Sequence, residues 1–415
     1  MSGTATTFLR HAIRFGRRAA ARAVRLFARP ARVAPLERQD PPRRPQRLLL
    51  VAWFDPKGLS TIAENIASIG RLSRFSFDLL NLYRRPFGPM AIPAAVRLDD
   101  YAGLFIHCTA SYDPANLLAL DAHRREKIAD YRGLKIMMKQ DEHYRTNRVI
   151  DYLARQRFDL LLTCMPPCSV GQVYGDPRLA RLRFLHTLTG YVSDRMRQFR
   201  LSQRDERPID VGYRGSLQPF HFGRLCYEKQ SIGYAFSEFC RRRGLAFDIS
   251  SRWEDRFLDE SWFGFLGRCK GILGTESGAS IFDFDGSVET AATDYLRRHP
   301  DAPFEEVWQA VLAPVEGNVY YNQVSPRHFE AAATRTVQLL YEGQYSGIFQ
   351  KDRHYLSIRR DHADADEALS RLMDPAERLR LSEAAFEEII MNDRWHYATF
   401  IKELDDAIEA LLDRR

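Results

Sequence analysis

Residues 48–53 read Leu-Leu-Leu-Val-Ala-Trp, a continuous apolar run that follows a stretch rich in arginine and proline. A short run without alternation of polar and apolar residues is typical of a strand buried on both faces of a parallel sheet. Ile62, Ile66 and Ile69 follow at helical spacing. This part of the chain is therefore predicted to begin with a strand and a helix, the first half of a βαβ unit.

The same alternation of strand and helix continues in two series. In the first we expect strands at 75–82, 101–108, 134–138 and 158–163, with helices at roughly 115–130 and 146–156. In the second we expect strands at 209–214, 245–249, 271–274 and 337–341, with helices at 226–243, after Ser325 and over most of 364–412. This order predicts parallel sheets with helices on both faces. The expected fold class is α/β, with two Rossmann-like domains that face each other across a ligand-binding cleft.

Composition divides the chain into five parts. The polar residues 200–208 separate the two series of strands, and the character of the chain changes abruptly near residue 47. The expected parts are a basic segment at 1–46, a first domain at 47–200, a linker at 201–208, a second domain at 209–390 and a C-terminal helix at 391–415 that returns to the first domain.

Positive charge is concentrated at the start of the sequence. Residues 1–47 contain twelve arginines and two acidic residues, which leaves 49 basic and 52 acidic residues in the remainder. Arginines at helical spacing over residues 8–29, with apolar residues on the opposite face, predict an amphipathic helix that lies on an anionic membrane surface. A solvated arm and an organelle transit peptide are the alternatives. Because the rest of the chain carries no basic excess, we expect no nucleic-acid partner.

Cysteine and acidic residues give no sign of a metal or a disulfide framework. The six cysteines lack zinc spacing, and Asp283-Phe-Asp-Gly286 lacks the further ligands of a calcium loop. No run of about 18 apolar residues could span a bilayer. We therefore expect no metal site, a reducing compartment and a cytoplasmic location, peripheral at the membrane.

Two loops rich in glycine follow strands of the second domain, where a doubly wound sheet binds its ligands. The loop at 210–216 contains Gly215, which lets the backbone approach a bulky anion, and Arg224 and Lys229 follow with positive charge. The loop at 273–280 places the carboxylate of Glu276 among small residues. Such a loop suits a hydroxyl-rich or phosphate-bearing ligand, or equally a tight turn in which Glu276 caps a neighbouring helix.

A third segment, residues 325–333, predicts the start of a helix, with Ser325 as N-cap and Pro326 at the first helical position. The positive end of this helix, together with Arg327, could hold a diphosphate. Glu330 could bind two ribose hydroxyls, or could only complement the helix dipole. A fourth segment forms either a ligand-binding loop or a surface turn; its candidate residues are Glu342, Gly343, Tyr345, Ser346 and Gly347.

These segments together resemble the nucleotide-binding half of group 1 glycosyltransferases of the GT-B type. The resemblance is good over residues 209–400 and only architectural over 48–200. It implies GT-B architecture, a first domain for the acceptor, Glu330 at the ribose, and no cofactor besides the nucleotide sugar that serves as substrate. Two departures are clear: position 322 is Asn where the family often has a Glu, and the segment with Arg224 and Lys229 begins later after its strand than in the family.

The resemblance implies transfer of a sugar from a nucleoside diphosphate to a hydroxyl of a glycan or lipid-linked acceptor, in the synthesis of cell-surface polysaccharide or glycoconjugates. Positive charge near the diphosphate would stabilise its departure. The resemblance assigns no nucleophile; Glu276 and Glu342 are the candidate carboxylates near the sugar. His107, Asp141 and His143, at or near strand ends of the first domain, are candidate bases. The alternatives are a nucleotide-sugar epimerase, a phosphorylase, or a non-catalytic membrane-associated scaffold with a degenerate cleft.

Overall fold

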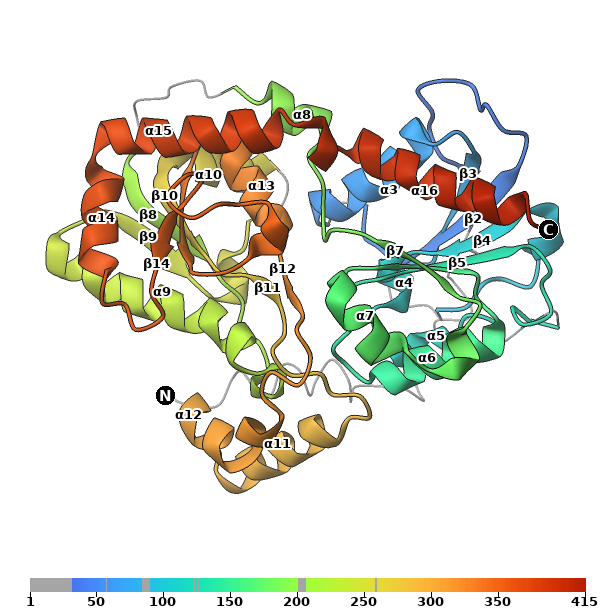
Figure 1. Ribbon diagram of the computed structural model, residues 1–415, viewed down its shortest axis with the longest axis horizontal. Helices are drawn as coiled ribbons and strands as arrows, with labels where there is room; N and C mark the ends of the chain where they lie inside the picture. Colours follow the sequence, from blue (N-terminus) through green and yellow to red (C-terminus); the bar gives the residue numbers. More distant parts are fainter. Residues whose placement is uncertain are drawn as a thin grey trace.

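The computed structural model describes residues 32–415, apart from residues 57, 84–89, 123, 126, 201–206 and 258–259. The helix expected over 8–29 and most of the linker expected at 201–208 lie outside these residues. Figure 1 shows two α/β lobes side by side, each with a sheet flanked by helices. The first lobe is the sheet of strands β1–β7 with its helices, and the second lobe is the sheet of strands β8–β14 with its helices.

The sheet of the first lobe has seven strands in the order β1-β3-β2-β4-β5-β6-β7, and all neighbours are parallel except β1 and β3. Residues 48–52 are fully buried, as the opening apolar run predicts. The chain passes from β2 to β3 on one side and then to β4 on the other, so the strand order reverses between β2 and β4. The strands are β1 (Val33–Pro35), β2 (Arg47–Ala52), β3 (Ser76–Asn81), β4 (Gly103–Ile106), β5 (Leu134–Lys139), β6 (Leu160–Thr163) and β7 (Arg183–His186).

The helices of the first lobe cover both faces of its sheet, and one of them differs from expectation. The helix predicted at 115–130 is wrong, because among the described residues of this segment only α5 (Pro114–Leu117) is helical. The Asp121 side chain accepts a hydrogen bond from the N–H of Ile128 at 3.0 Å, a side-chain bond that competes with helix formation. The other helices are α3 (Ser60–Leu72), α4 (Cys108–Ser111), α6 (Thr146–Gln156), α7 (Pro167–Tyr174) and α8 (Asp194–Gln198).

The sheet of the second lobe has five parallel strands in the order β14-β13-β10-β8-β9, so its order reverses between β8 and β10. A two-stranded antiparallel sheet of β11 (Ser277–Gly278) and β12 (Asn322–Gln323) follows β10. The main strands are β8 (Ile209–Arg214), β9 (Phe247–Ser250), β10 (Cys269–Gly274), β13 (Val337–Tyr341) and β14 (Leu356–Ile358). The two parallel sheets confirm the predicted fold class of two Rossmann-like domains.

Five helices that the structure describes in the second lobe pack on its sheet, and two further helices form an insertion below the sheet in Figure 1. The helices on the sheet are α9 (Arg224–Arg243), α10 (Glu260–Arg268), α13 (Pro326–Ala333), α14 (Ala365–Met373) and α15 (Pro375–Ala385). The insertion contains α11 (Ser287–Arg298) and α12 (Phe304–Val307). No helix in the described part of the chain is both long enough and apolar enough to cross a bilayer.

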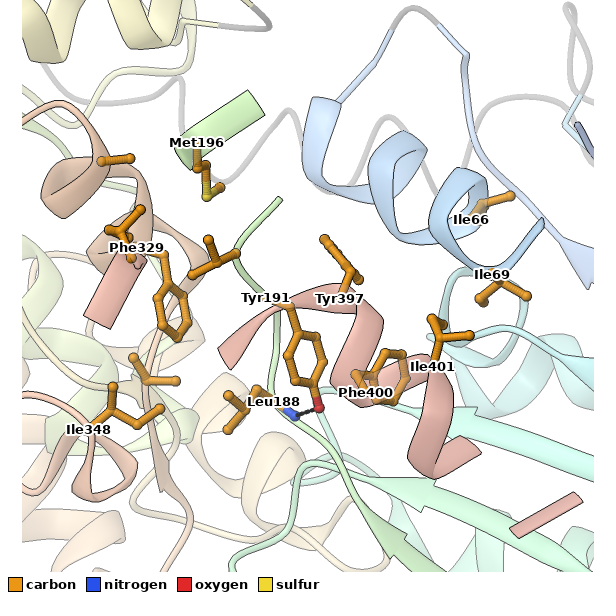
Figure 2. Close-up of a cluster of buried hydrophobic side chains, with 14 of the residues drawn as sticks. Ile66, Ile69, Leu188, Tyr191, Met196, Phe329, Ile348, Tyr397, Phe400 and Ile401 are labelled. Atoms are coloured by element: carbon orange, nitrogen blue, oxygen red, sulfur yellow. Dashed lines mark hydrogen bonds between the residues drawn. The ribbon is translucent and has the colours of Figure 1, made fainter. Parts of the chain in front are cut away.

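The last helix, α16 (Tyr397–Leu412), crosses back and packs on α3 of the first lobe (Figure 1). Ser73 donates a hydrogen bond to the Asp405 carboxylate at 2.6 Å. Tyr191 stacks on Phe400 with ring centroids 4.4 Å apart, and Figure 2 shows these rings at the centre of an apolar cluster that continues to Phe329 of α13. This cluster therefore joins the two lobes along one edge.

The opposite edge is joined by the loop that follows β5. The N–H of Asp283 donates to the carbonyl oxygen of His143 at 2.8 Å, and Arg145 forms an ion pair with Glu289 of α11 at 2.7 Å. The lobes thus contact each other at two edges. Between them lies a cavity of about 480 Å³, the cleft cavity. It is lined by Cys164 and His186 of the first lobe and, in the second, by Tyr320, Asn322, Gln323, Gln344, Ser346 and Gly347.

Candidate active site

A polar cavity lies at the carboxyl ends of β8 and β10, where the strand order of the second sheet reverses. This is the place at which open α/β sheets bind their ligands. The cavity has a volume of about 160 Å³. We call it the polar cavity; its principal lining residues are Gly215, Ser216, Lys229, Trp262, Thr275, Ser325, Arg327 and His328.

The start of α13 forms one wall of the polar cavity, and the predicted helix start at Ser325 is confirmed. The hydroxyl of Ser325 accepts from the N–H of Arg327 at 3.4 Å, and His328 Nδ1 accepts from the N–H of Ser325 at 2.9 Å. Burial lowers the pKa of His328 to about 3, so the ring is neutral and can accept this bond. The helix therefore directs its positive end at the cavity with its first turn fixed.

Two cationic side chains reach the polar cavity without a matching carboxylate. Arg327 donates to the carbonyl oxygen of Arg214 and lies over the ring of Trp262, 5.3 Å from its centroid. Among the residues that the structure describes, no carboxylate lies within ion-pair distance of Lys229 or Arg327. Arg214 itself is already paired with Asp248 at 2.8 Å. The cavity thus carries positive charge from a helix terminus and from two side chains that form no ion pair within the described residues.

Gly215 lies at this wall and is closely packed. A Cβ atom at this position would lie 2.5 Å from the Ser251 hydroxyl and 3.0 Å from the carbonyl oxygen of Lys229. Glycine is therefore required by the close packing of the end of β8 against its neighbours. Whether a ligand also approaches this backbone stays a prediction.

The carboxylate of Glu276 holds two of the predicted loops together. It is buried and accepts from the N–H groups of Gln344 at 3.0 Å and Tyr345 at 2.8 Å, while Asn322 donates to its other oxygen at 2.7 Å. A Cβ at Gly343 would lie 2.6 Å from this carboxylate, so glycine is needed there. The alternative that Glu276 caps a neighbouring helix fits this geometry, because Tyr345–Gly347 forms a 3-10 turn.

The other residues of the loop after β13 separate into buried and exposed positions. Glu342 is half-buried and pairs with Lys351, and this partner lowers the pKa of its carboxyl. It lines neither the polar cavity nor the cleft cavity. Tyr345 is buried and donates its hydroxyl to the carbonyl oxygen of Tyr341 at 2.6 Å. Ser346 and Gly347 have positive φ angles of 55° and 72° and line the cleft cavity.

Glu330 lies on the opposite face of α13 from His328 and does not line the polar cavity. Two residues along an α-helix rotate by about 200°, which explains the separation. The buried Glu330 carboxylate accepts from the indole N–H of Trp262 at 2.7 Å, and burial raises its pKa. It borders a small cavity of about 40 Å³ between the lobes, together with Arg195 and Tyr191.

Arg224, expected beside Lys229, also lies apart from the polar cavity. It is the first residue of α9, and its guanidinium pairs with Glu305 at 2.7 Å and lies 4.6 Å from the ring centroid of Trp308. Both partners belong to the insertion. The structure thus brings Lys229, Ser325, Arg327 and Gly215 together and directs Arg224 to another surface.

The two candidate histidines of the first lobe are buried. His107 caps α4, and its Nε2 lies 3.1 Å from the Asn65 side-chain oxygen. His143 packs edge-on against Phe222, with ring centroids 4.4 Å apart. Burial lowers the pKa of each imidazole to about 3. Neither ring borders the polar cavity or the cleft cavity.

Asp141, the third candidate base, faces the second lobe. It follows β5 with a positive φ of 51°, a conformation that Asp tolerates better than most residues. Water reaches the side chain, yet surrounding protein desolvates it and raises its pKa, while the charges of Lys139 and Lys229 act in the opposite direction. Asp141 is therefore a first-lobe carboxylate close enough to interact with a cation of the polar cavity.

Sequence reasoning missed Trp262 and His328. Trp262 contacts both Arg327 and Glu330. In the sequence it is a single tryptophan in a short helix of the second domain, a pattern that does not indicate a binding site. His328 occupies the third helical position, where Glu or Gln usually completes a capping box. A histidine at that position, with a Ser N-cap, could have predicted the bond that fixes the helix start.

Acidic residues elsewhere are used as caps. The carboxylate of Asp283 accepts from the N–H groups of Gly286 at 2.8 Å and Glu289 at 2.9 Å, at the start of α11. Over the described ranges, no group of three or more His, Cys, Asp or Glu side chains could hold a metal ion.

No protein-family model matches the chain, and no curated protein matches it significantly. Among solved structures, it is similar to HepE from Anabaena in complex with UDP and glucose, with 10% identity, 88% of this chain and 100% of that chain covered, and a TM-score of 0.49. It is also similar to AviGT4, a glycosyltransferase involved in avilamycin A biosynthesis (13% identity, 89% and 99% covered, TM-score 0.42). A third similar structure is TarM (8% identity, 74% covered, TM-score 0.44), of which the chain spans 54%.

Proposed function

We propose that this chain is a glycosyltransferase that moves a sugar from a nucleoside diphosphate to a hydroxyl acceptor. The observation that carries the proposal is the polar cavity, where Lys229, Arg327 and the start of α13 converge at the switch point of the second sheet. Two cations and a helix N-terminus are what a diphosphate needs, since each can donate hydrogen bonds to phosphate oxygens.

The same groups can lower the barrier of the transfer. When the bond between the anomeric carbon and the diphosphate breaks, negative charge grows on the diphosphate oxygens. Arg327 is held in advance by the carbonyl oxygen of Arg214 and the ring of Trp262, and α13 is fixed by its capping box. Charges held in place before the reaction stabilise the transition state without the cost of reorganisation.

Glu330 supports this site through Trp262. Its carboxylate fixes the indole N–H, and the indole ring lies beside Arg327 at the wall of the polar cavity. We assign Glu330 as a positioning residue in the described conformation. A direct contact between Glu330 and a ribose stays a prediction.

The acceptor side belongs to the first lobe in this proposal. In this proposal Asp141 accepts a hydrogen bond from an acceptor hydroxyl, which the electrostatic interaction of its carboxylate with Lys229 of the second lobe supports. We propose a glycan or lipid-linked acceptor, and a cytoplasmic enzyme that contacts the membrane surface through residues 8–29. The arginine pattern of that segment supports this location.

A ligand screen tests the proposal. The chain is mixed with the diphosphates of uridine, guanosine, adenosine and thymidine and with their glucose conjugates, and its melting temperature is measured. A ligand present at 100 times its Kd stabilises by about 2.7 kcal/mol, which raises the melting temperature by several degrees. We expect at least one diphosphate to do so and its monophosphate to do so less. No shift with any of them would overturn the proposal.

A further inference from the structure

A second cavity, of about 420 Å³, lies at the carboxyl ends of β2 and β4, where the strand order of the first sheet reverses. It therefore occupies in the first lobe the place that the polar cavity occupies in the second. Its walls are mainly apolar and aromatic. We call it the Trp53 pocket; the apolar side chains that line it are Trp53, Phe54, Leu59, Ile62, Met90 and Tyr112.

Leu59 neither caps its helix through its side chain nor belongs to the buried core. It is the N-cap of α3 and makes no side-chain capping bond, although Ser, Thr, Asp and Asn are strongly preferred at this position. Leu59 is 52% exposed, and Tyr112 on the same wall is 61% exposed. Residues that break a local rule and expose apolar surface in a cavity mark binding sites.

The aromatic floor of the pocket is fixed from two sides. The backbone N–H of Trp53 donates to the Thr109 hydroxyl at 3.1 Å, and the Trp53 ring packs edge-on against the ring of Tyr83, with centroids 5.1 Å apart. The side chain of Asn81 accepts from the N–H of Phe54 at 3.2 Å and donates to its carbonyl oxygen at 2.9 Å. A wall that is already ordered loses little entropy when a ligand binds.

The rim of the pocket leads towards the polar cavity. Lys139 at the end of β5, two residues before Asp141, donates from its Nζ to the carbonyl oxygen of Tyr112 at 3.0 Å, so the pocket wall contacts the strand end that leads to Asp141. Asp141 in turn interacts with Lys229 of the second lobe. A ligand in the Trp53 pocket with a hydroxyl at Asp141 would therefore present this hydroxyl to the polar cavity.

We propose that the Trp53 pocket binds the apolar group of an amphipathic acceptor whose hydroxyl-bearing end reaches Asp141. This inference rests on the proposed function and names its acceptor class. Among the described lining residues, Asp55 is the charged side chain and Thr109 and Asn116 are neutral polar ones. A wholly polar glycan would leave hydroxyl groups unpaired against Leu59, Ile62 and Met90, which is costly, whereas an apolar group would not.

The test compares two probes that share a sugar, octyl and methyl β-D-glucopyranoside, by titration calorimetry below the micelle concentration of the octyl compound. We expect the octyl glucoside to bind at least about tenfold more tightly than the methyl glucoside. Leu59→Ser should weaken octyl binding about tenfold and leave methyl binding unchanged. Tyr112→Ser, at the second exposed position, should also weaken octyl binding.

Leu379→Ser is the matched control, because Leu379 is 59% exposed on α15 of the second lobe. Leu59→Ser is expected to fold, since serine is favoured as an N-cap, and an unchanged or higher melting temperature checks this. Equal affinity for both glucosides, or octyl binding unchanged by both pocket variants, would overturn the inference. Binding of a nucleoside diphosphate to the same samples is measured separately. If a nucleoside diphosphate binds but the octyl glucoside binds no more tightly than the methyl glucoside, only this inference is wrong. If the octyl glucoside binds more tightly but no diphosphate binds, the proposed function is wrong.

Discussion

The two lobes place cavities at equivalent positions but build them from different chemistry. Each cavity lies where the strand order of its sheet reverses, between β2 and β4 in the first lobe and between β8 and β10 in the second. The polar cavity carries Lys229 and Arg327, while the Trp53 pocket exposes Leu59 and Tyr112. Sheet topology therefore sets where a ligand can bind, and the residues directly after each strand set what can bind.

The strand ends themselves explain the contrast. The second sheet ends its central strands with Gly215-Ser216 and Gly274-Thr275, which leave a narrow polar space. After β2 the first sheet continues with Trp53-Phe54, which form a wide aromatic floor. In the function that we propose, separate lobes hold the anionic donor and the apolar part of the acceptor.

The largest effect is expected from removing the charge of the polar cavity. The double variant Lys229→Ala with Arg327→Ala should weaken nucleoside diphosphate binding by about 4 kcal/mol, about a thousandfold, because each charge-assisted bond contributes about 2 kcal/mol. Octyl glucoside binding should be unchanged, because these residues do not line the Trp53 pocket. Titration calorimetry with both ligands measures the two affinities.

The control removes the same two charges elsewhere. Lys402 pairs with Asp406 on α16 and Arg353 pairs with Glu388, and both cations are exposed. The double variant Lys402→Ala with Arg353→Ala should bind the diphosphate as the wild type does. If both double variants lose affinity to the same extent, the effect is one of net charge, and the polar cavity is not the anion site.

An intermediate effect is expected at the loop that follows β5 and joins the two lobes. Glu142, next to Asp141, is buried, and its carboxylate accepts from the Thr163 hydroxyl at 2.7 Å and the N–H of Cys164 at 3.0 Å, and also from the Tyr174 hydroxyl. Burial raises the pKa of this carboxyl from 4.5 to about 7. The loop that carries Asp141 is thus anchored by a group that titrates near neutral pH.

The sign of the pH dependence follows from the raised pKa. Below pH 4.5 both the folded and the unfolded chain hold the proton, whereas between 4.5 and about 7 only the folded chain does. The free energy of unfolding should therefore fall by up to about 3 kcal/mol as pH rises through this window. Glu142→Gln should remove that part of the slope, and Glu367→Gln on the exposed surface of α14 should keep it. Denaturant unfolding at several pH values measures both slopes, and identical slopes in wild type and Glu142→Gln would contradict this account.

Much of the fold could be predicted because its signals are local. The buried run at 48–52 and the Ser325 cap with Pro326 depend on neighbours in sequence, and both form as predicted. The helix expected at 115–130 failed because the bond between Asp121 and Ile128 offers the backbone another partner.

The candidate site was harder to predict because its members depend on distant partners. Arg224 forms an ion pair with Glu305, and Glu330 accepts a hydrogen bond from Trp262; both partners lie far away in the sequence. Glu276 closes on the loop at 342–347, so two segments chosen separately form one unit. The Trp53 pocket was not predicted, since an apolar residue after a buried strand has the same pattern as core. Only its exposure in the folded chain distinguishes Leu59 from a core leucine.

The smallest effect is expected at Leu59 itself, on stability. Leu59→Ser places a favoured N-cap at the start of α3 and removes an exposed side chain with no capping bond, so the free energy of unfolding should rise by about 1 kcal/mol. Leu379→Ser should instead lose about 0.5 kcal/mol, because serine has a lower helix propensity inside α15. Urea unfolding of both variants measures the difference. A lower free energy of unfolding in Leu59→Ser would show that the leucine stabilises the free protein by packing, and the argument that Leu59 serves a ligand would fail. A higher value would show that serine stabilises α3 better than the native leucine, as expected if Leu59 serves binding.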